Sequence, residues 1–484
     1  MIARSFIQRG GPVATLLASA ALAGCTMAPT YERPAAPVST AFPVGDAYEQ
    51  AITPAEGQTA ADIGWRDFFN DPLLQTLVER ALDNNRDLRV SALNVESARA
   101  QYRIQRSELL PNLSIGGEGS AQHLPDPLFY NRRSYQVGAS VSAWELDLWG
   151  RLRSLSSEAL QKYSALAETR NAAQLSLVAE VANAYLTLRA DQELLRLSRE
   201  TLAAQQKSYD LTKQLVDVGN VAQLDLRRAE IALRTAESDM ATYTRLAAQD
   251  RNALVLLLGE PLTPALARQL DAADTLADNV VPDSLPAGLP SDLLTRRPDI
   301  RAAEHMLRGA NANIGAARAA FFPTISLTGS AGTASADLDG LFSSGPGAWS
   351  FLPRITMPIF RLGAIKANLD RAEVQKRIEI ATYEKAIQSA FREVSDGLAG
   401  QGTLDEQIRA ERLRAEASRK SYALSRQRYE AGEDGNLALL DAQRSLYGAE
   451  QSLVRARLLR LTNLINLYKA LGGGWMERSA TDAG

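Results

Sequence analysis

The chain contains few of the side chains that carry catalysis or bind metal ions. Its 484 residues include two histidines and one cysteine. No glycine-rich stretch has the spacing of a phosphate-binding P-loop, and no His, Cys or carboxylate residues cluster as they do in an enzyme active site. We therefore expect neither an enzyme nor a bound cofactor, and the residue of chemical interest is the single cysteine, Cys25.

Cys25 follows a segment that has the features of a bacterial secretory signal. Two arginines precede Gly11–Ala23, a small, apolar stretch of about 13 residues that is too short to span a bilayer. The sequence then reads Leu-Ala-Gly-Cys, which is typical of a lipoprotein signal-peptidase site. We predict that residues 1–24 are removed, that Cys25 is lipidated, and that Thr26, which is not an aspartate, favours sorting to the outer membrane. An ordinary signal with a chance cysteine is the alternative.

The charge of the chain is nearly balanced. Lysine and arginine number 53 against 56 aspartates and glutamates, and loss of residues 1–24, with two arginines and no acid, changes the formal net charge from −3 to −5. This balance does not favour a nucleic-acid partner. A lipid chain alone anchors a protein weakly, so we expect a second membrane element.

The chain is internally duplicated. Residues 421–472 align without a gap on residues 208–259 at a spacing of 213, with about 15 of 52 positions identical. Upstream, residues 321–327 align on residues 109–115. Each copy therefore predicts a helix, a strand that follows a proline, a loop, a second strand, a glycine, a long helix, a tight turn and a returning helix.

Two strand pairs are predicted, at residues 112–122 and 134–145 and at residues 324–332 and 349–360. In the second strand, Tyr135, Val137, Ala139, Val141 and Ala143 alternate with polar or small residues, which predicts that they share one face. Each strand has the length of a tilted transmembrane strand, and aromatic residues collect near the strand ends, as in an interfacial girdle. Two ordinary hairpins in a soluble protein are the alternative.

The long helices carry coiled-coil patterns. Residues 151–218 contain neither glycine nor proline, and apolar residues recur every seven positions from Val181. At about 1.5 Å per residue this helix would be roughly 100 Å long. A helix over 221–258 returns from the turn. In the second copy the helices are expected at 364–430 and 437–471, with Gly397, Gly400 and Gly402 making the middle of the first one irregular.

Four strands cannot close a barrel, and open strand edges in lipid leave backbone groups unpaired. Three copies of the chain would supply about 12 strands, enough for a barrel with an aqueous lumen. The charged helices would then form a hollow ring instead of a packed core.

Six short motifs distributed along the chain carry a family resemblance. They are Leu22-Ala23-Gly24-Cys25, Tyr31 with Arg33-Pro34, Trp65-Arg66-Asp67-Phe68-Phe69, Arg296-Arg297-Pro298-Asp299-Ile300, Leu439-Leu440-Asp441-Ala442-Gln443-Arg444, and Tyr468-Lys469-Ala470-Leu471-Gly472-Gly473-Gly474-Trp475. Together they resemble the outer-membrane factor (TolC-like) family, in the lipoprotein branch that includes OprM of multidrug efflux by RND systems.

The resemblance implies a mainly α fold with a transmembrane β part: a homotrimer whose 12-stranded outer-membrane β-barrel lies over a long periplasmic α-helical barrel. It implies the exit duct of a tripartite efflux pump for drugs or other small organic compounds, located in the outer membrane in contact with its lipid. A periplasmic membrane-fusion adaptor would dock on it, and an inner-membrane RND-type pump would supply the energy.

The resemblance also implies a gate. The matching positions are Leu437 and Asp441, with Arg444 and Tyr429 as bonding partners. Leu437, Asp441 and Arg444 are spaced i, i+4 and i+7, so a helix would place them on one face. An ordinary surface ion pair is the alternative reading of Asp441 and Arg444. The turns that would face the adaptor contain Gly219, Asn220, Gly432, Asp434 and Gly435.

The predicted organisation follows from these elements: signal peptide 1–24, tether and equatorial segment 25–70, first repeat 71–259, equatorial linker 260–297, second repeat 298–472 and tail 473–484. Two other functions stay open. One is a lipid-anchored periplasmic coiled-coil scaffold or adaptor without a pore. The other, within channels, is a duct for metal ions or for type I secretion.

Overall fold

A computed structural model describes residues 26–48, 59–124, 130–272, 275–286, 290–343, 347–361 and 363–479. The predicted signal peptide and Cys25 lie outside the described residues. The chain divides into two compact units. Unit 1 comprises the residues up to and including Ala35, Leu93–Ala167 and Ala302–Glu384, and unit 2 comprises Ala36–Ala92, Glu168–Arg301 and the residues from Lys385 onward.

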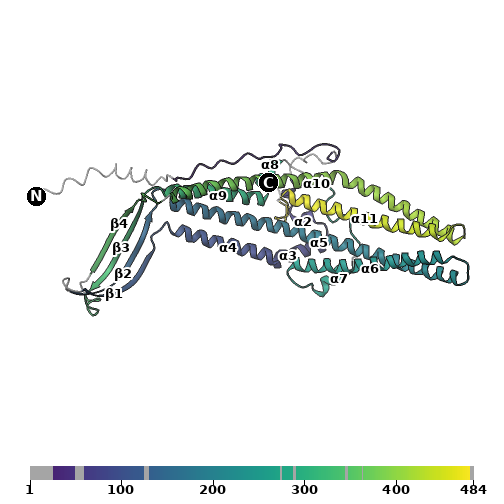
Figure 1. The fold of residues 1–484 in the computed structure, drawn as a ribbon, viewed down its shortest axis with the longest axis horizontal. Coiled ribbons are helices and arrows are strands. Elements are labelled where there is room, and N and C mark those ends of the chain that lie inside the picture. Colours follow the sequence, from purple (N-terminus) through teal and green to yellow (C-terminus); the bar gives the residue numbers. More distant parts are fainter. Residues whose placement is uncertain are drawn as a thin grey trace. The chain divides into compact units, whose positions relative to one another are not determined.

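The helices dominate the chain (Figure 1). In order, the elements are η1 Ala60–Asp62, α2 Trp65–Phe68, α3 Pro72–Asn84, α4 Arg86–Ser107, β1 Leu113–Leu124, β2 Tyr130–Leu146, α5 Arg151–Asp217, α6 Gln223–Leu258, α7 Pro264–Ala272, α8 Pro290–Arg296, α9 Pro298–Ala319, β3 Thr324–Ser335, β4 Gly347–Thr356, α10 Ala364–Glu430 and α11 Asn436–Ala470. The predicted linker thus holds two short helices, and the predicted tether holds η1 and α2.

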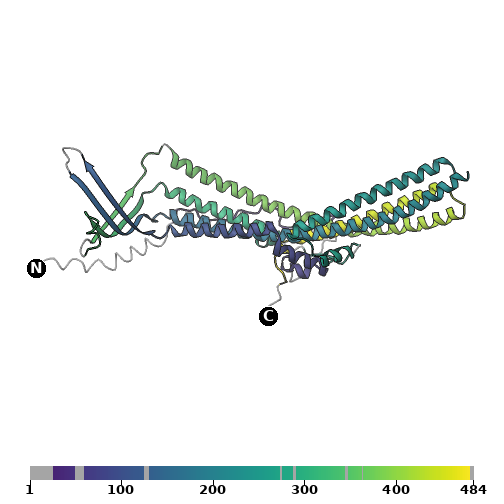
Figure 2. The ribbon, with the colours of Figure 1, turned by 90° about the horizontal axis from the view of Figure 1, so that it is seen from below.

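Unit 1 contains one antiparallel sheet in the order β1-β2-β3-β4 (Figures 1 and 2). The strand bounds differ from the prediction. The end of β1 and the start of β2 extend further into the predicted loop between them, and β4 ends at Thr356 instead of residue 360. The alternation predicted through Ala143 is wrong at that residue. Val141 pairs with Gly329 and Trp144 with Leu327, so β2 carries one extra residue as a bulge, and Ala143 has φ 48°.

The N-terminal segment of unit 1 is extended, as predicted, but it is held along α9. The Asn311 side chain donates to the Pro29 carbonyl at 2.7 Å. Arg33 donates to both carboxylate oxygens of Glu304, at 3.1 and 2.8 Å, and Tyr31 and Arg308 donate to the same carboxylate. Burial by itself raises the pKa of Glu304, but the hydrogen bonds and charges of Arg308 and Arg33 outweigh it, so this pKa lies below its usual range.

Unit 2 is built from two helix hairpins, in which α6 returns beside α5 and α11 beside α10 (Figures 1 and 2). Val181 and Leu188 of the predicted seam are fully buried. In α11, the row Ala442, Ala449 and Ala456 is buried. Alanine at this spacing lets a neighbouring helix approach closely.

Both hairpins turn in the same way. Gly219 has φ +76° and Gly432 has φ +74°. The amides of Gly219 and Asn220 donate to the Val216 and Leu215 carbonyls, and Gly432 and Glu433 repeat this pattern one copy later. This is the Schellman arrangement, in which a glycine in the left-handed region ends a helix. Equal turns at a spacing of 213 residues confirm the duplication.

The irregular middle predicted for the second long helix is wrong. α10 is continuous over 67 residues. A Cβ atom on Gly397 would lie 2.9 Å from Leu467, one on Gly400 2.4 Å from Asn463, and one on Gly402 2.2 Å from the Ala47 carbonyl. The three glycines therefore allow close packing against other segments and do not break the helix.

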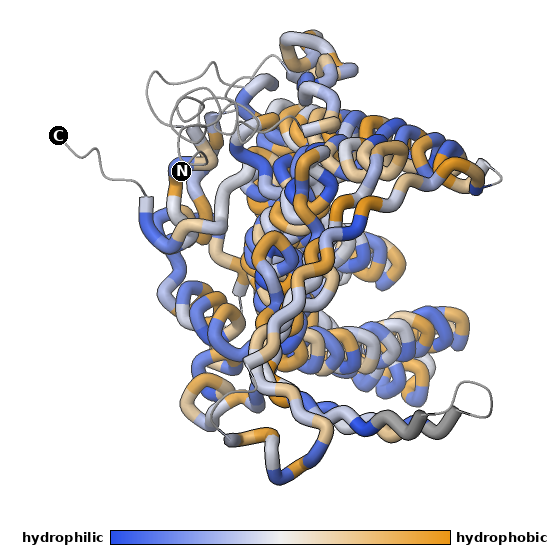
Figure 3. Tube along the Cα trace, turned by 90° about the vertical axis from the view of Figure 1, so that its left-hand side faces the viewer, coloured by the Kyte–Doolittle hydropathy of each residue, from blue (hydrophilic) through white to orange (hydrophobic). Residues whose placement is uncertain are grey.

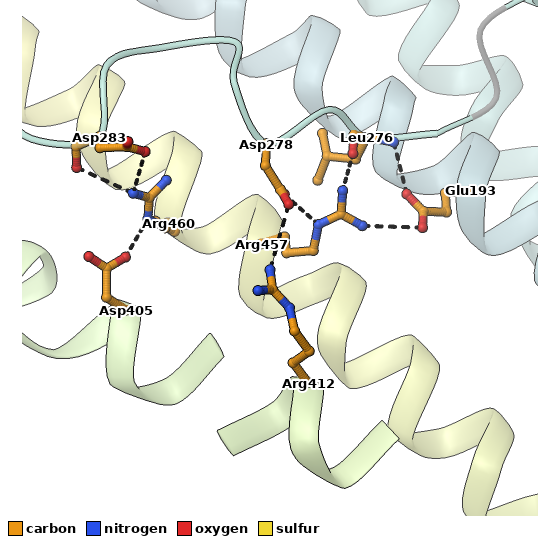
Figure 4. A network of polar contacts seen from close by, with 8 residues as sticks. All are labelled: Glu193, Leu276, Asp278, Asp283, Asp405, Arg412, Arg457 and Arg460. Carbon is orange, nitrogen blue, oxygen red and sulfur yellow. Dashed lines mark hydrogen bonds and ion pairs between the residues drawn. The ribbon is translucent and has the colours of Figure 1, made fainter. Parts of the chain in front are cut away.

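Arginines of α11 hold the linker in unit 2 (Figure 4). Arg457 pairs with Asp278 at 2.6 Å and with Glu193 of α5 at 3.3 Å, and it donates to the Leu276 carbonyl. Arg460 pairs with Asp283 at 3.1 Å and also with Asp405 of α10. The linker is therefore tied to three long helices.

Among the described residues, no helix has both the length and the apolar character needed to cross a membrane. Figure 3 shows hydrophilic and hydrophobic residues alternating at short intervals along the helices.

Candidate functional site

The first turns of α11 place three predicted gate residues together. Leu437 is 55% exposed. The Arg444 guanidinium donates to the Asp441 carboxylate at 2.5 Å, and these two side chains are 60% (Asp441) and 82% (Arg444) exposed. An apolar residue and an ion pair thus lie on an accessible helix face. A second chain could meet this face without displacing any packed core residue.

Tyr429 lies near the end of α10 and is half-buried. Its carbonyl accepts from the Gly432 amide at 3.0 Å. Within the part of the chain that the structure describes, its hydroxyl makes no hydrogen bond with Asp441 or Arg444. Among the residues that the structure describes, the bond to Asp441 therefore comes from Arg444.

The turn between α10 and α11 is reinforced by charge. Arg428 donates to both carboxylate oxygens of Asp434, at 2.6 and 2.9 Å. The hydrogen bond from Arg428, followed by its positive charge, lowers the pKa of Asp434 below its usual value despite some desolvation. Gly435 provides the N-cap position of α11 with φ −78°. The predicted adaptor-facing residues Gly219, Asn220, Gly432 and Gly435 are all exposed.

A groove not expected from the sequence lies beside the gate residues. Its walls come from α5, α6 and α11, and its volume is about 360 Å³. Leu437, Asp441 and Arg444 line it, together with Gln205 of α5 and Asp239 of α6. Heptad periodicity predicted that these helices pack together. It could not show which residues from helices more than 200 positions apart would face one space.

Across the described ranges, no group of three or more His, Cys, Asp or Glu residues is placed to hold a metal ion.

Comparison with known proteins decides the family. The family model described as "Outer membrane efflux protein" matches residues 77–260 and again residues 289–473. The chain belongs to the outer membrane efflux protein family. The two matches have nearly the spacing of the internal duplication, so each repeat carries the family pattern.

The relatives of this outer membrane efflux protein are similar over nearly its full length. The antibiotic efflux pump outer membrane protein ArpC of Pseudomonas putida is 50% identical over 464 residues, covering 95% of this chain and 94% of ArpC. The toluene efflux pump outer membrane protein TtgC of Pseudomonas putida is 49% identical with the same coverage.

The solved structures agree. The open state of the MtrE outer membrane channel of Neisseria gonorrhoeae superposes with a TM-score of 0.84 at 43% identity, covering 94% of this chain and all of MtrE. The predicted TolC-like resemblance, and the mainly α, internally duplicated fold, are confirmed.

Proposed function

We propose that this protein is the outer-membrane channel of a tripartite efflux pump and acts as a passive exit duct for small organic compounds. The observation that carries the proposal is similarity over nearly the whole chain to efflux-pump outer membrane proteins, combined with the fold of an outer membrane channel. Antibiotics and toluene, named for the relatives, are the compound classes we expect for this chain.

The sheet of unit 1 supports assembly with other copies. β1 pairs with β2 and β4 pairs with β3, so within the described residues the outer edges of β1 and β4 have no partner strand. Ile115, Trp349 and Ile355 on these edge strands are exposed in a single chain. Unpaired backbone groups are costly in a bilayer and aggregation-prone in water. A trimer that joins β1 of one chain to β4 of the next would satisfy them in a barrel of about 12 strands.

The gate proposal rests on the start of α11. In a trimer, three Leu437 side chains would form an apolar constriction and three Asp441–Arg444 pairs a charged ring at the periplasmic tip. The exposed hairpin turns would receive a periplasmic adaptor, which links the channel to an inner-membrane RND-type pump. The chain would then need no energy source of its own.

Membrane attachment is proposed to have two parts. The Leu-Ala-Gly-Cys sequence supports a lipid on Cys25, and the contacts of Pro29, Tyr31 and Arg33 with α9 would hold the lipidated end against unit 1. A single lipid is a weak anchor, so the strands would supply the permanent one.

Planar-bilayer recording of the purified protein, with its mass measured by light scattering, tests this function. We expect a particle with three times the mass of one chain and small, long-lived currents. A water-soluble particle that gives no current would refute the channel and favour the lipid-anchored scaffold.

A further inference from the structure

The groove between α5, α6 and α11 has an apolar wall. Ile231 and Ala232 of α6 face Leu437 and Leu440 of α11 across a volume of about 360 Å³. Small-molecule sites have volumes in this range, with mostly apolar walls and a few polar groups that orient the ligand. The space suits an aromatic molecule of two or three rings.

One buried polar atom points to a ligand. Gln205 lines the groove and is only 6% exposed. Its side-chain oxygen Oε1 is buried and accepts no hydrogen bond from any described residue. A buried acceptor without a donor is unfavourable, so a ligand that brings an N–H group into the groove would stabilise this site.

The charge of the groove favours a cation. Two of the four charged residues that line it are arginines, and both are already paired: Arg228 with Asp225 at 3.3 Å, and Arg444 with Asp441 at 2.5 Å. Asp239 makes no ion pair with any residue in the described ranges.

Tyr447, which also lines the groove, adds no charge. Burial is the largest effect on its phenol and, together with the charge of Asp239 and the hydrogen bond with that residue, raises the pKa of Tyr447 to about 12, so this side chain is neutral at physiological pH. The uncompensated charge of the groove is therefore the carboxylate of Asp239.

We propose that this groove binds an amphipathic organic cation, with its rings against Ile231 and Leu440 and its amine directed to Asp239 and Gln205. The Tyr447 phenol is a hydrogen-bond partner of the Asp239 carboxylate but does not neutralise its charge. An organic anion would be repelled by this carboxylate, and a neutral molecule would leave its charge uncompensated. The three observations, an apolar wall, a buried acceptor and one acid without an ion pair among the described residues, thus select the same ligand class.

Binding would also affect the gate, and this second step rests on the proposed channel function. Leu437 and Asp441 form part of the groove wall. A ligand that needs the present spacing of α6 and α11 stabilises that arrangement over any other. Occupancy should therefore hold α11 in place and lower the frequency of opening.

The binding test uses the full-length purified protein in detergent and two probes of matched shape. 9-Aminoacridine is a cation at neutral pH, whereas acridine is largely uncharged, and equilibrium dialysis measures both. A charge-assisted hydrogen bond lost in Asp239→Asn should weaken 9-aminoacridine binding about tenfold and leave acridine binding unchanged. Ala232→Trp should fill the groove and weaken both probes.

The matched control is Glu237→Gln. It removes the same charge from the same helix, but Glu237 pairs with Arg234 at 2.9 Å and does not line the groove. Its affinity for either probe should stay within about twofold of the parent. Ile231→Ser serves as the second groove variant should the tryptophan disturb folding, because Ile231 is largely exposed and its loss spares the core.

Three results would overturn the site: no saturable binding of 9-aminoacridine, an equal loss in Asp239→Asn and Glu237→Gln, or unchanged binding in both groove variants. Conductance separates the site from the channel. Saturable binding without current would support the binding site and refute the channel. Current without binding would support the channel and refute the binding site. Binding that leaves opening unchanged refutes the coupling to the gate.

Discussion

Removal of the apolar and acidic gate side chains together should open the channel while hardly affecting the stability of the fold. The perturbation is Leu437→Ala with Asp441→Ala. Complete burial of a leucine side chain contributes about 2 kcal/mol, and Leu437 is 55% exposed. An exposed ion pair contributes about 0.3 kcal/mol. The double variant should therefore lose about 1 kcal/mol of unfolding free energy per chain.

The effect on gating accumulates because a trimer would contain each contact three times. A loss of about 0.5 kcal/mol per chain in the closed state sums to about 1.5 kcal/mol for the ring, which shifts the ratio of closed to open channels about tenfold. Single-channel recording should show that increase in open probability, and thermal unfolding should show little change.

The control variant combines Leu459→Ala with Glu237→Ala. Leu459 is 50% exposed on α11, and Glu237 belongs to an exposed i, i+3 pair with Arg234. These changes remove the same kinds of side chain away from the turn. Unchanged conductance in the gate variant, or an equal increase in the control, would refute the gate assignment.

Three further predictions concern the anchor, the N-terminal segment and the packing of α10. Cys25→Ser should abolish incorporation of radiolabelled palmitate while strand insertion keeps the protein in the membrane fraction; labelling of the serine variant would contradict the lipid site. Glu304→Gln should remove part of the stability that depends on pH. Because folding lowers the pKa of this carboxyl, its contribution is present above the pKa of the unfolded chain and is lost as pH falls through the lower folded value, so melting of parent and variant should converge in acid. If the melting temperatures of parent and variant still differ at a pH below the folded and the unfolded pKa of Glu304, the result would argue against the ion cluster. Gly402→Ala should destabilise the fold by about 1–3 kcal/mol, since its Cβ would meet a backbone carbonyl, whereas Gly448→Ala should stabilise it by about 1 kcal/mol, since its Cβ would lie in open space. Opposite shifts in chemical unfolding check this pair, and shifts of the same sign would show that close packing at α10 is not the cause.

Much of the architecture could be predicted because it depends on local and periodic signals. The repeat of 213 residues placed equal turns at Gly219 and Gly432, and heptad spacing identified Val181 and Leu188 as core residues. The ends of β1, β2 and β4 were predicted less accurately, since strand bounds depend on pairing partners. The bulge at Ala143 carries no local signal and becomes visible only in the pairing of β2 with β3.

The glycines of α10 show most clearly where prediction from the sequence failed. Three glycines within six residues predicted an irregular helix, since glycine is a poor helix former. The prediction failed because Leu467, Asn463 and Ala47 press against these positions, and only residues without a side chain permit that approach. Intrinsic propensity was outweighed by packing with segments remote in the sequence.

The sequence alone determined the duplication, the long helices, the turns and the family resemblance, because each depends on neighbouring residues or on a fixed spacing. The tertiary structure alone decided that Gln205, Asp239 and Leu437 line one groove and that Arg457 ties the linker to α5. Those relations depend on how helices far apart in the chain pack, and side chains from three helices share a surface only after that packing has set which faces meet.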